Sequence, residues 1–275
     1  MAHGVKVRRA CLIVGISVAA PYRKPSPDRN ASLKARLQEI VRPGMGYRGA
    51  WLELRNEFAP LNVKRVHRLW KELRLGRKTK YRKKRTGKSV PTQASSPGEV
   101  WSLDFIHDSC MNGTKLKILV VLDEFTRETL ALEVATSIKS RSVQAILARL
   151  IKERGAPSYL RSDNGPEFIA RTLKIWLGQS GIESRLIEPG SPWQNAYVES
   201  FNSRLRAEFL NAEVFMNLAD AQMKCAVFRR FYNEQRPHSS LGGQTPSEAA
   251  REWESGRAAP SLPSHSLVLS NMEKL

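Results

Sequence analysis

The feature that most constrains this chain is an abrupt change in charge near residue 98. Residues 1–98 hold 24 Lys and Arg against 5 Asp and Glu, whereas residues 99–275 hold 21 of each, so the whole excess of +19 belongs to the first part. A charge this unevenly placed indicates two parts with different tasks, and the basic part predicts a polyanionic partner. The stretch 86–98 is rich in Ser, Thr, Pro and Gly and predicts a linker between them.

Composition places the chain among ordinary globular proteins. With 275 residues, 41% hydrophobic and 26% charged, it can bury a sizeable core, which argues against wholesale disorder, a collagen-like repeat or a coiled-coil rod. Cys11, Cys110 and Cys225 are too widely spaced for a CxxC zinc site or a disulfide framework, and they favour a reducing compartment.

The N-terminus contains an apolar stretch that imitates a targeting signal. Residues 11–20 are apolar or small and follow a basic start, as in a secretory signal, but Gly15 and Ser17 interrupt the run. We favour a short helix, a turn and a second helix here. No apolar run approaches the roughly 18 residues of a membrane span, so no membrane partner is expected.

Residues 1–85 predict a small helical, basic, DNA-binding region. Apolar residues at helical spacing predict helices over 32–41, 47–58 and 62–73, which together suggest a helix-turn-helix domain. A solvated helix face would also explain the basic residues of the third helix, but residues 74–88 add nine Lys or Arg, which favours nucleic acid. The predicted DNA contacts in this region are Lys64, Arg65, Arg68, Lys71, Arg82, Lys83, Lys84 and Arg85.

Residues 99–254 predict a mixed α/β domain, followed by a loose tail over 255–275. Strands are expected at 99–106, 116–122, 129–134, 159–163 and 182–187, and helices at 140–153 and 168–177. Ser191 and Pro192 predict the cap and first turn of a further, long helix. On that helix Asn195, Asn202, Ser203 and Arg206 share a polar face with Glu199, opposite Val198, Phe201, Leu205 and Phe209.

Three carboxylates in this domain suggest metal chemistry. Asp104 lies in mid-strand, where Asp is costly unless it is hydrogen-bonded or bound to a cation, Asp163 closes a strand, and Glu199 centres the polar helix face. Mg²⁺ uses few protein carboxylates together with water and phosphate oxygens, so three carboxylates can support two ions for phosphoryl transfer. By itself, the polar helix face is better explained by solvation.

Other ionisable residues near these positions are alternative candidates for metal ligands or catalytic groups. Asp123 is the second choice as a ligand, although a strand-to-turn junction explains it. We expect Asp108, Glu124 and Glu167 to be solvated, and we leave His107 and His238 out of the catalytic set because metal-activated water needs no histidine.

Four motifs in order now give a resemblance. Asp104 and Asp163 have 58 residues between them, Asp163 and Glu199 have 35, and the motifs are VWSLDF (100–105), RSDNGPEF (161–168), GSPWQNAYVESF (190–201) and YNEQRPHSSL (232–241). The chain resembles the retroviral-integrase-like DDE transposases, and in particular the second-reading-frame (OrfB-type) product of a large bacterial insertion-sequence family. The resemblance covers roughly residues 5–250. It implies an RNase H-like catalytic core, a five-stranded mixed sheet with flanking helices.

The resemblance also implies a site, cofactors and partners. Asp104, Asp163 and Glu199 would hold two Mg²⁺ ions, which Mn²⁺ could replace, and a DNA 3′-hydroxyl or water would attack the strand. Further predicted DNA contacts are Asn195, Asn202, Arg204 and Arg206. The expected partners are double-stranded DNA at element ends and target, other copies of the chain on DNA, and an upstream-frame helix-turn-helix product. The expected location is the bacterial cytoplasm, at the nucleoid.

Two departures from the resembled pattern and two alternative functions remain open. Ala196 stands where such proteins commonly have Gly, and the paired His and Cys of retroviral N-terminal domains are missing. Because Ala is the better helix former, we expect little effect from Ala196.

The alternatives are a catalytically silent DNA-binding regulator of an intact transposase, and a structure-directed nuclease of RNase H type. The basic N-terminal part weighs against the nuclease, because hydrolysis of an RNA strand does not need it.

Overall fold

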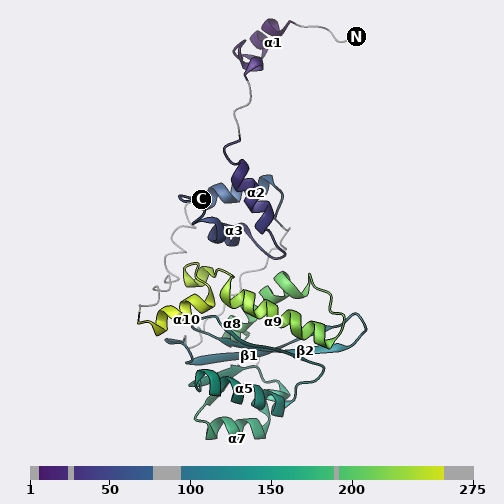
Figure 1. The fold of residues 1–275 in the computed structure, drawn as a ribbon, viewed down its shortest axis with the longest axis vertical. Coiled ribbons are helices and arrows are strands. Elements are labelled where there is room, and N and C mark those ends of the chain that lie inside the picture. The colour runs from purple at the N-terminus through teal and green to yellow at the C-terminus, as the bar shows by residue number, and fades with distance from the viewer. Residues whose placement is uncertain (1–5, 24–27, 77–93, 189–191, 257–275) are drawn as a thin grey trace. The chain divides into compact units, whose positions relative to one another are not determined.

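The computed structural model describes residues 6–23, 28–76, 94–188 and 192–256 (Figure 1). The chain divides into two compact units, Met1–Glu39 and Ile40–Leu275, which are described separately. The predicted contacts Arg82, Lys83, Lys84 and Arg85 lie outside the described residues, as do most of the predicted linker and tail.

The first unit begins with helix α1, Val7–Val14, which ends at Gly15 in the left-handed conformation (φ 70°). Its Leu12, Ile13 and Val14 are exposed, whereas Cys11 is buried. The second helix expected here is wrong, because only a 3₁₀ turn, η1 (Ala20–Tyr22), follows. Pro21 has no amide hydrogen, so a helix started at Ser17 could not run through it.

The three helices expected in the basic region are confirmed as α2 (Ala31–Ile40), α3 (Tyr47–Leu54) and α4 (Val63–Glu72). Asn62 caps α4 by accepting a 2.7 Å hydrogen bond from the amide of Lys64. The helix buries Val66, Leu69 and Trp70 on one face. Its predicted DNA contacts are exposed at Lys64, Arg68 and Lys71 and half-buried at Arg65.

The second unit contains the expected five-stranded mixed sheet. The strands are β1 (Val100–Ser109), β2 (Lys115–Asp123), β3 (Thr129–Ala135), β4 (Tyr159–Ser162) and β5 (Glu183–Leu186). Their order is β3-β2-β1-β4-β5, with β1, β2 and β3 antiparallel and β4 parallel to both β1 and β5. This confirms the α/β fold of the RNase H-like type.

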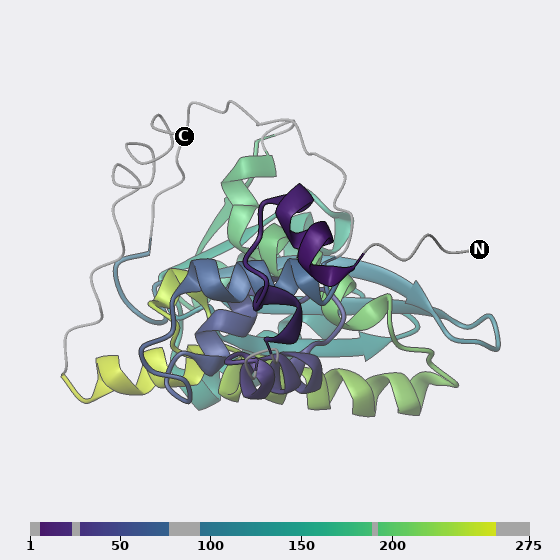
Figure 2. The same ribbon diagram turned by 90° about the horizontal axis from the view of Figure 1, so that it is seen from above.

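Helices cover both faces of the sheet (Figure 1). The helices α8 (Ala196–Leu205) and α9 (Leu218–Glu234) pack on one face, where Ile118, Val120, Phe201 and Tyr232 share a core. The helices α5 (Ser140–Arg154) and α7 (Arg171–Gln179) pack on the other, with Trp101, Leu103 and Val121. In the view from above, α9 runs along one side of the sheet, and the hairpin joining β1 to β2 projects beyond the helices (Figure 2).

Two predicted helices have different boundaries. The single helix expected over 168–177 is wrong, because Ala170 has an extended backbone (φ −53°, ψ 128°) and separates α6 (Pro166–Ile169) from α7. The helix expected from Ser191 begins only at Ala196, after a 3₁₀ turn, η2 (Pro192–Asn195). Asn195 leaves helical geometry (φ −113°, ψ 30°), and its side chain bonds to β1 instead.

The remaining elements follow α8 and α9. A π-helical turn, η3 (Arg206–Leu210), continues α8, and after α9 come η4 (Ser239–Leu241) and α10 (Pro246–Glu254), which Thr245 and Glu248 begin with a capping box. No helix in the described residues is long and apolar enough to cross a membrane. Cys11, Cys110 and Cys225 are free thiols and are buried.

Candidate active site

The register of the sheet brings two of the predicted carboxylates together. Ser102 of β1 pairs with Arg161 of the parallel strand β4. Asp104 follows Ser102 by two residues, and Asp163 follows Arg161 by two residues. The two carboxylates therefore start from neighbouring strands, which lie about 4.8 Å apart in a sheet. β4 ends at Ser162, so Asp163 stands at the edge where the strand becomes a turn.

Asp104 lies on the face of the sheet that α8 covers, since Asp104 and Ile106 alternate with Leu103 and Phe105. Its carboxylate accepts hydrogen bonds from the Phe105 amide at 2.8 Å and from the Asn202 side chain at 2.6 Å. Burial, together with the negative charges of Asp163 and Glu199, raises the pKa of Asp104 to about 6. Asp163 and Glu199 are therefore both near enough to Asp104 for their charges to act on it.

Three side chains fasten the polar face of α8 to β1 around Glu199. Asn195 donates to the carbonyl of Leu103 at 3.2 Å, Asn202 donates to Asp104, and Arg206 donates to the carbonyl of His107 at 3.1 Å. Glu199 is half-buried between them, and Val198, Phe201 and Leu205 on the opposite side are fully buried. This face meets the sheet beside Asp104, so solvation does not explain it.

The turn that carries Asp163 is tightly built. Asp163 accepts a 3.1 Å hydrogen bond from the amide of Gly165, and the Asn164 side chain donates to the carbonyl of Ile187 at 2.8 Å. A Cβ at Gly165 would lie 3.0 Å from the Asp163 Oδ1, closer than real Cβ atoms usually come to a neighbour. A glycine here lets the Asp163 carboxylate bend back over its own turn.

The donor set fits a hard divalent cation. Carboxylate oxygens are the ligands that Mg²⁺ prefers, and the charges of Asp163 and Glu199 help to raise the pKa of Asp104. In the part of the chain that the structure describes, no three His, Cys, Asp or Glu side chains are arranged closely enough to hold a metal ion as they stand. The Asp104 Oδ2 is engaged by Asn202 instead.

The rival carboxylates have structural partners. Asp123 accepts hydrogen bonds from the amides of Gly98, Phe125 and Thr126, as expected for a strand-to-turn junction. Glu124 is not solvated: it is 1% exposed and forms an ion pair with the buried Arg161 at 2.7 Å. The pattern that could have revealed it is an arginine at a buried strand position, which needs an acidic partner.

Two other residues also differ from the solvated picture. Glu167 pairs with Lys117 at 2.5 Å, and this ion pair holds its pKa below the usual range despite partial burial. His238 is 1% exposed rather than a surface group, and its ring packs edge-on against Tyr232. His107 is exposed, and Asp108 is half-buried and accepts a 2.8 Å bond from the Ser109 amide.

The side chains predicted to contact DNA from α8 have partners within the protein. Asn195 is 3% exposed, and Asn195, Asn202 and Arg206 make the contacts to β1 described above. Arg204 is half-buried and lies near the hydroxyl of Tyr232. Asn202 and Arg204 lie on α8 as predicted, whereas Asn195 lies in η2 before it and Arg206 in η3 after it. The sequence pattern did not indicate that Asn195, Asn202 and Arg206 bind the sheet.

Comparisons with known proteins agree with this fold. Two family models described as "Integrase core domain" match residues 94–192 and 180–246. An insertion element IS476 protein of 39.2 kDa from Xanthomonas euvesicatoria is 41% identical over 261 residues, covering 93% of this chain and 75% of that protein. An insertion element IS407 protein of 31.7 kDa from Burkholderia multivorans is 39% identical over 263 residues, covering 93% and 94%.

More distant similarities extend to a named transposase and to a viral integrase. The putative transposase InsK of insertion sequence IS150 from Escherichia coli is 28% identical over 238 residues, covering 81% of this chain and 84% of that protein. Among solved structures, the HTLV-2 integrase catalytic core in complex with magnesium aligns with a TM-score of 0.44 and 19% identity, covering 55% of this chain and 95% of that one.

Proposed function

Since the chain belongs to the bacterial insertion-sequence transposases with an integrase core, we propose that it cuts and joins DNA strands with divalent metal held by Asp104, Asp163 and Glu199. Magnesium is the proposed ion, two ions are expected, and manganese is expected to substitute. A bound divalent ion activates the attacking oxygen and stabilises the leaving oxygen of an in-line displacement.

The observation that supports this proposal is that Asp163 and Glu199 lie near enough to Asp104 for their charges to raise its pKa. The three carboxylates come from the middle of β1, the end of β4 and the face of α8. Structural carboxylates are usually paired with cations, as Glu124 is with Arg161. A carboxylate whose pKa is raised by two neighbouring carboxylates suits a site that receives positive charge from outside the chain.

The chain's own residues orient the reaction. Asn202 fixes the Asp104 carboxylate, Asn195 and Arg206 hold α8 at two points on either side of Glu199, and the amide of Gly165 orients Asp163. Asp104 and Glu199 themselves lie on a regular strand and a helix, which keep a site more precise than flexible loops do. The protein therefore supplies orientation, and we expect no covalent protein–DNA intermediate.

The basic helices are proposed to bind the DNA that the core acts on. Lys64, Arg68 and Lys71 are exposed on α4, opposite its buried stripe, which suits contacts with phosphates. Arg65 on the same helix and the basic residues beyond the described segment remain predicted contacts. We also propose that copies of the chain assemble on paired element ends, with an upstream-frame product as a further partner.

The test compares strand nicking and joining on DNA carrying the element's own ends, with Mg²⁺, Mn²⁺ or EDTA. We expect the native chain to join strands with either metal, whereas Glu199→Gln binds the same DNA and loses activity by at least about 10³-fold. Glu153→Gln, an exposed carboxylate on α5, is the matched control and should stay active.

A different outcome would change the assignment. If native protein, Glu199→Gln and control all bind DNA and none cuts it, even with the upstream product present, the chain is a silent DNA-binding regulator. If all three cut equally, the activity does not come from this site.

A further inference from the structure

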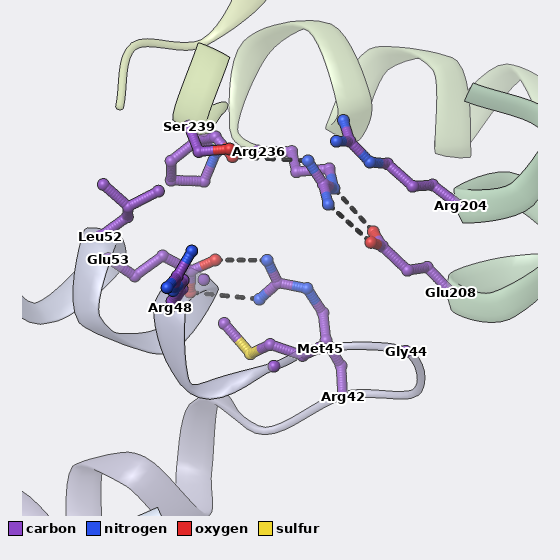
Figure 3. Close-up of a pocket in the computed structure, with 13 residues that line it drawn as sticks. Arg42, Gly44, Met45, Arg48, Leu52, Glu53, Arg204, Glu208, Arg236 and Ser239 are labelled. Carbon is purple, nitrogen blue, oxygen red and sulfur yellow. Dashed lines mark hydrogen bonds and ion pairs between the residues drawn. The ribbon is translucent and has the colours of Figure 1, made fainter. Parts of the chain in front are cut away.

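A cavity of about 260 Å³ lies between the segment around α3 and the end of the catalytic core, within the second unit (Figure 3). Four arginines line it, Arg42, Arg48, Arg204 and Arg236, with only two carboxylates, Glu53 and Glu208, so its lining carries an excess of two positive charges. The space is small for an organic ligand but holds several water-sized groups.

Two of the arginines are oriented by the two carboxylates. Arg42 donates to Glu53 through both terminal nitrogens, and Arg236 donates to Glu208 through Nε and Nη2 at 2.7 and 2.6 Å. These paired bonds hold the guanidinium planes in place, and Arg236 keeps Nη1 with long contacts of 3.4 Å to Pro237 and His238. Each arginine therefore retains a donor edge that its carboxylate does not occupy.

The other two arginines supply the charge that is not neutralised. Arg48 is exposed and contacts Tyr47 through a 3.2 Å hydrogen bond to its hydroxyl and a cation–π approach, and it has no carboxylate partner in the described residues. Arg204 is half-buried and lies near the hydroxyl of Tyr232. A small anion bound in the cavity would neutralise the positive charge of both arginines.

Close backbone approach builds one wall of this cavity. Gly44 has a left-handed backbone (φ 75°), and a Cβ there would lie 2.7 Å from Glu208 Cγ and 2.9 Å from the backbone of Ala207. Gly46 and Gly49 also line the space. Met45 between the glycines also lines the space, so only the glycine positions leave the main chain open to a ligand.

We propose that this cavity binds a phosphodiester group of DNA. The inference rests on the proposed function, since DNA is the substrate there, and it adds a specific contact away from the carboxylate site. One phosphate group of a DNA strand would contact all four arginines. Arg42 lies just before α3, Arg48 lies on α3, and Arg204 and Arg236 belong to the core. DNA bound here would hold the helical segment and the core together as one binding surface.

The test measures DNA affinity against salt concentration in EDTA, so that cleavage cannot contribute. Losing one phosphate contact lowers the slope of log K against log salt by about 1. We expect Arg48→Gln to show this loss with a several-fold weaker affinity, and Arg48→Lys to keep the slope. Arg141→Gln, which removes an exposed charge on α5, is the control and should keep the native slope.

A second arm distinguishes the source of the phosphate group. Inorganic phosphate, exchanged for chloride at constant ionic strength, should compete with DNA for the native chain and much less for Arg48→Gln. If phosphate binding depends on Arg48 while the DNA slope does not, the cavity is a free-phosphate site and the proposal is wrong. Equal slope changes in Arg48→Gln and Arg141→Gln would also overturn it.

The result is independent of the catalytic proposal. If Arg48→Gln lowers the salt slope but the native chain joins no strands, phosphate binding in the cavity is supported and the metal assignment is rejected. A chain that joins strands normally with an unchanged slope in Arg48→Gln keeps the metal assignment and loses the cavity.

Discussion

At the scale of single residues, polar side chains in this core do different work from what their sequence positions suggest. The sequence spacing is typical of a solvated or DNA-facing row for Asn195, Asn202 and Arg206. Each of them instead donates a hydrogen bond to β1, either to a backbone carbonyl or to the side chain of Asp104. Their spacing placed them correctly beside Glu199. It could not show the partner, because a helix face is polar both when it meets water and when it meets exposed carbonyls at a strand edge.

Gly165 provides a test of how precisely Asp163 must be held. Gly165→Ala adds a Cβ 3.0 Å from Asp163 Oδ1, at a backbone conformation (φ −57°) that alanine tolerates. We expect strand joining to fall about 10- to 100-fold with little loss of stability, because the carboxylate must shift. The readouts are single-turnover joining and thermal unfolding.

Gly178→Ala is the matched control for this change. Its Cβ would meet nothing within 4 Å, and Gly178 lies inside α7, so activity should stay and stability should rise by up to about 1 kcal/mol. Equal activity of the two variants would mean that the Asp163 turn tolerates displacement.

His238 predicts how stability depends on pH. Burial, with the positive charges of Arg236, Arg204 and Arg127, lowers the pKa of His238 to about 2, from about 6.5 in an unfolded chain. Below about pH 6.5, His238 binds a proton in the unfolded chain but not in the folded chain. The stabilisation is therefore complete above pH 6.5 and is lost as the pH falls, by up to about 1.4 kcal/mol per unit.

The measurement is urea unfolding between pH 7 and pH 5. His238→Asn should be less stable at pH 7 because it loses ring packing against Tyr232, and its stability should fall less steeply with acid. Parallel curves for the two proteins would show that His238 does not titrate in this way.

At the scale of elements, a buried ion pair joins the central strands. Arg161 of β4 donates at 2.7 Å to both oxygens of Glu124, which follows β2, and the hydroxyl of Ser102 on β1 also bonds Glu124. The cluster lies two residues before Asp104 and Asp163 on their strands. It therefore sets the spacing of the strands that present the two carboxylates.

Breaking this pair should be costly. Glu124→Gln removes the carboxylate charge that faces the buried guanidinium of Arg161, and we expect a loss of about 3–5 kcal/mol in the free energy of unfolding. Glu133→Gln, which breaks the exposed pair with Arg149, should cost about 1 kcal/mol or less. Similar losses in chemical denaturation of both variants would contradict the structural role of Glu124.

At the scale of the whole molecule, the charge division at residue 98 separates DNA affinity from chemistry. Residues 99–275 carry 21 basic and 21 acidic residues, so this part has little long-range attraction for DNA. We expect a fragment of residues 94–256 to bind DNA at least about 10-fold more weakly than the full chain, with a shallower salt dependence. Circular dichroism would confirm its folding, and an unchanged slope would place the main DNA contacts in the core.

Much of this protein could be predicted from its sequence. Alternation and helical spacing gave five strands and most helices, because each pattern depends on residues adjacent in the chain. The motifs placed Asp104, Asp163 and Glu199 on two strands and a helix of an RNase H-like core. The break at Ala170 and the late start of α8 were missed, because side-chain bonds and backbone angles at single residues decided them.

Only the tertiary structure decided which polar groups face one another. It paired Glu124 with Arg161 across 37 residues, joined Asn202 to Asp104 across 98, and enclosed four arginines from three separate segments in one cavity. A local sequence pattern reports whether a residue is on a polar or an apolar face. The partner depends on sheet register and helix docking, which the packing of the whole core determines at once.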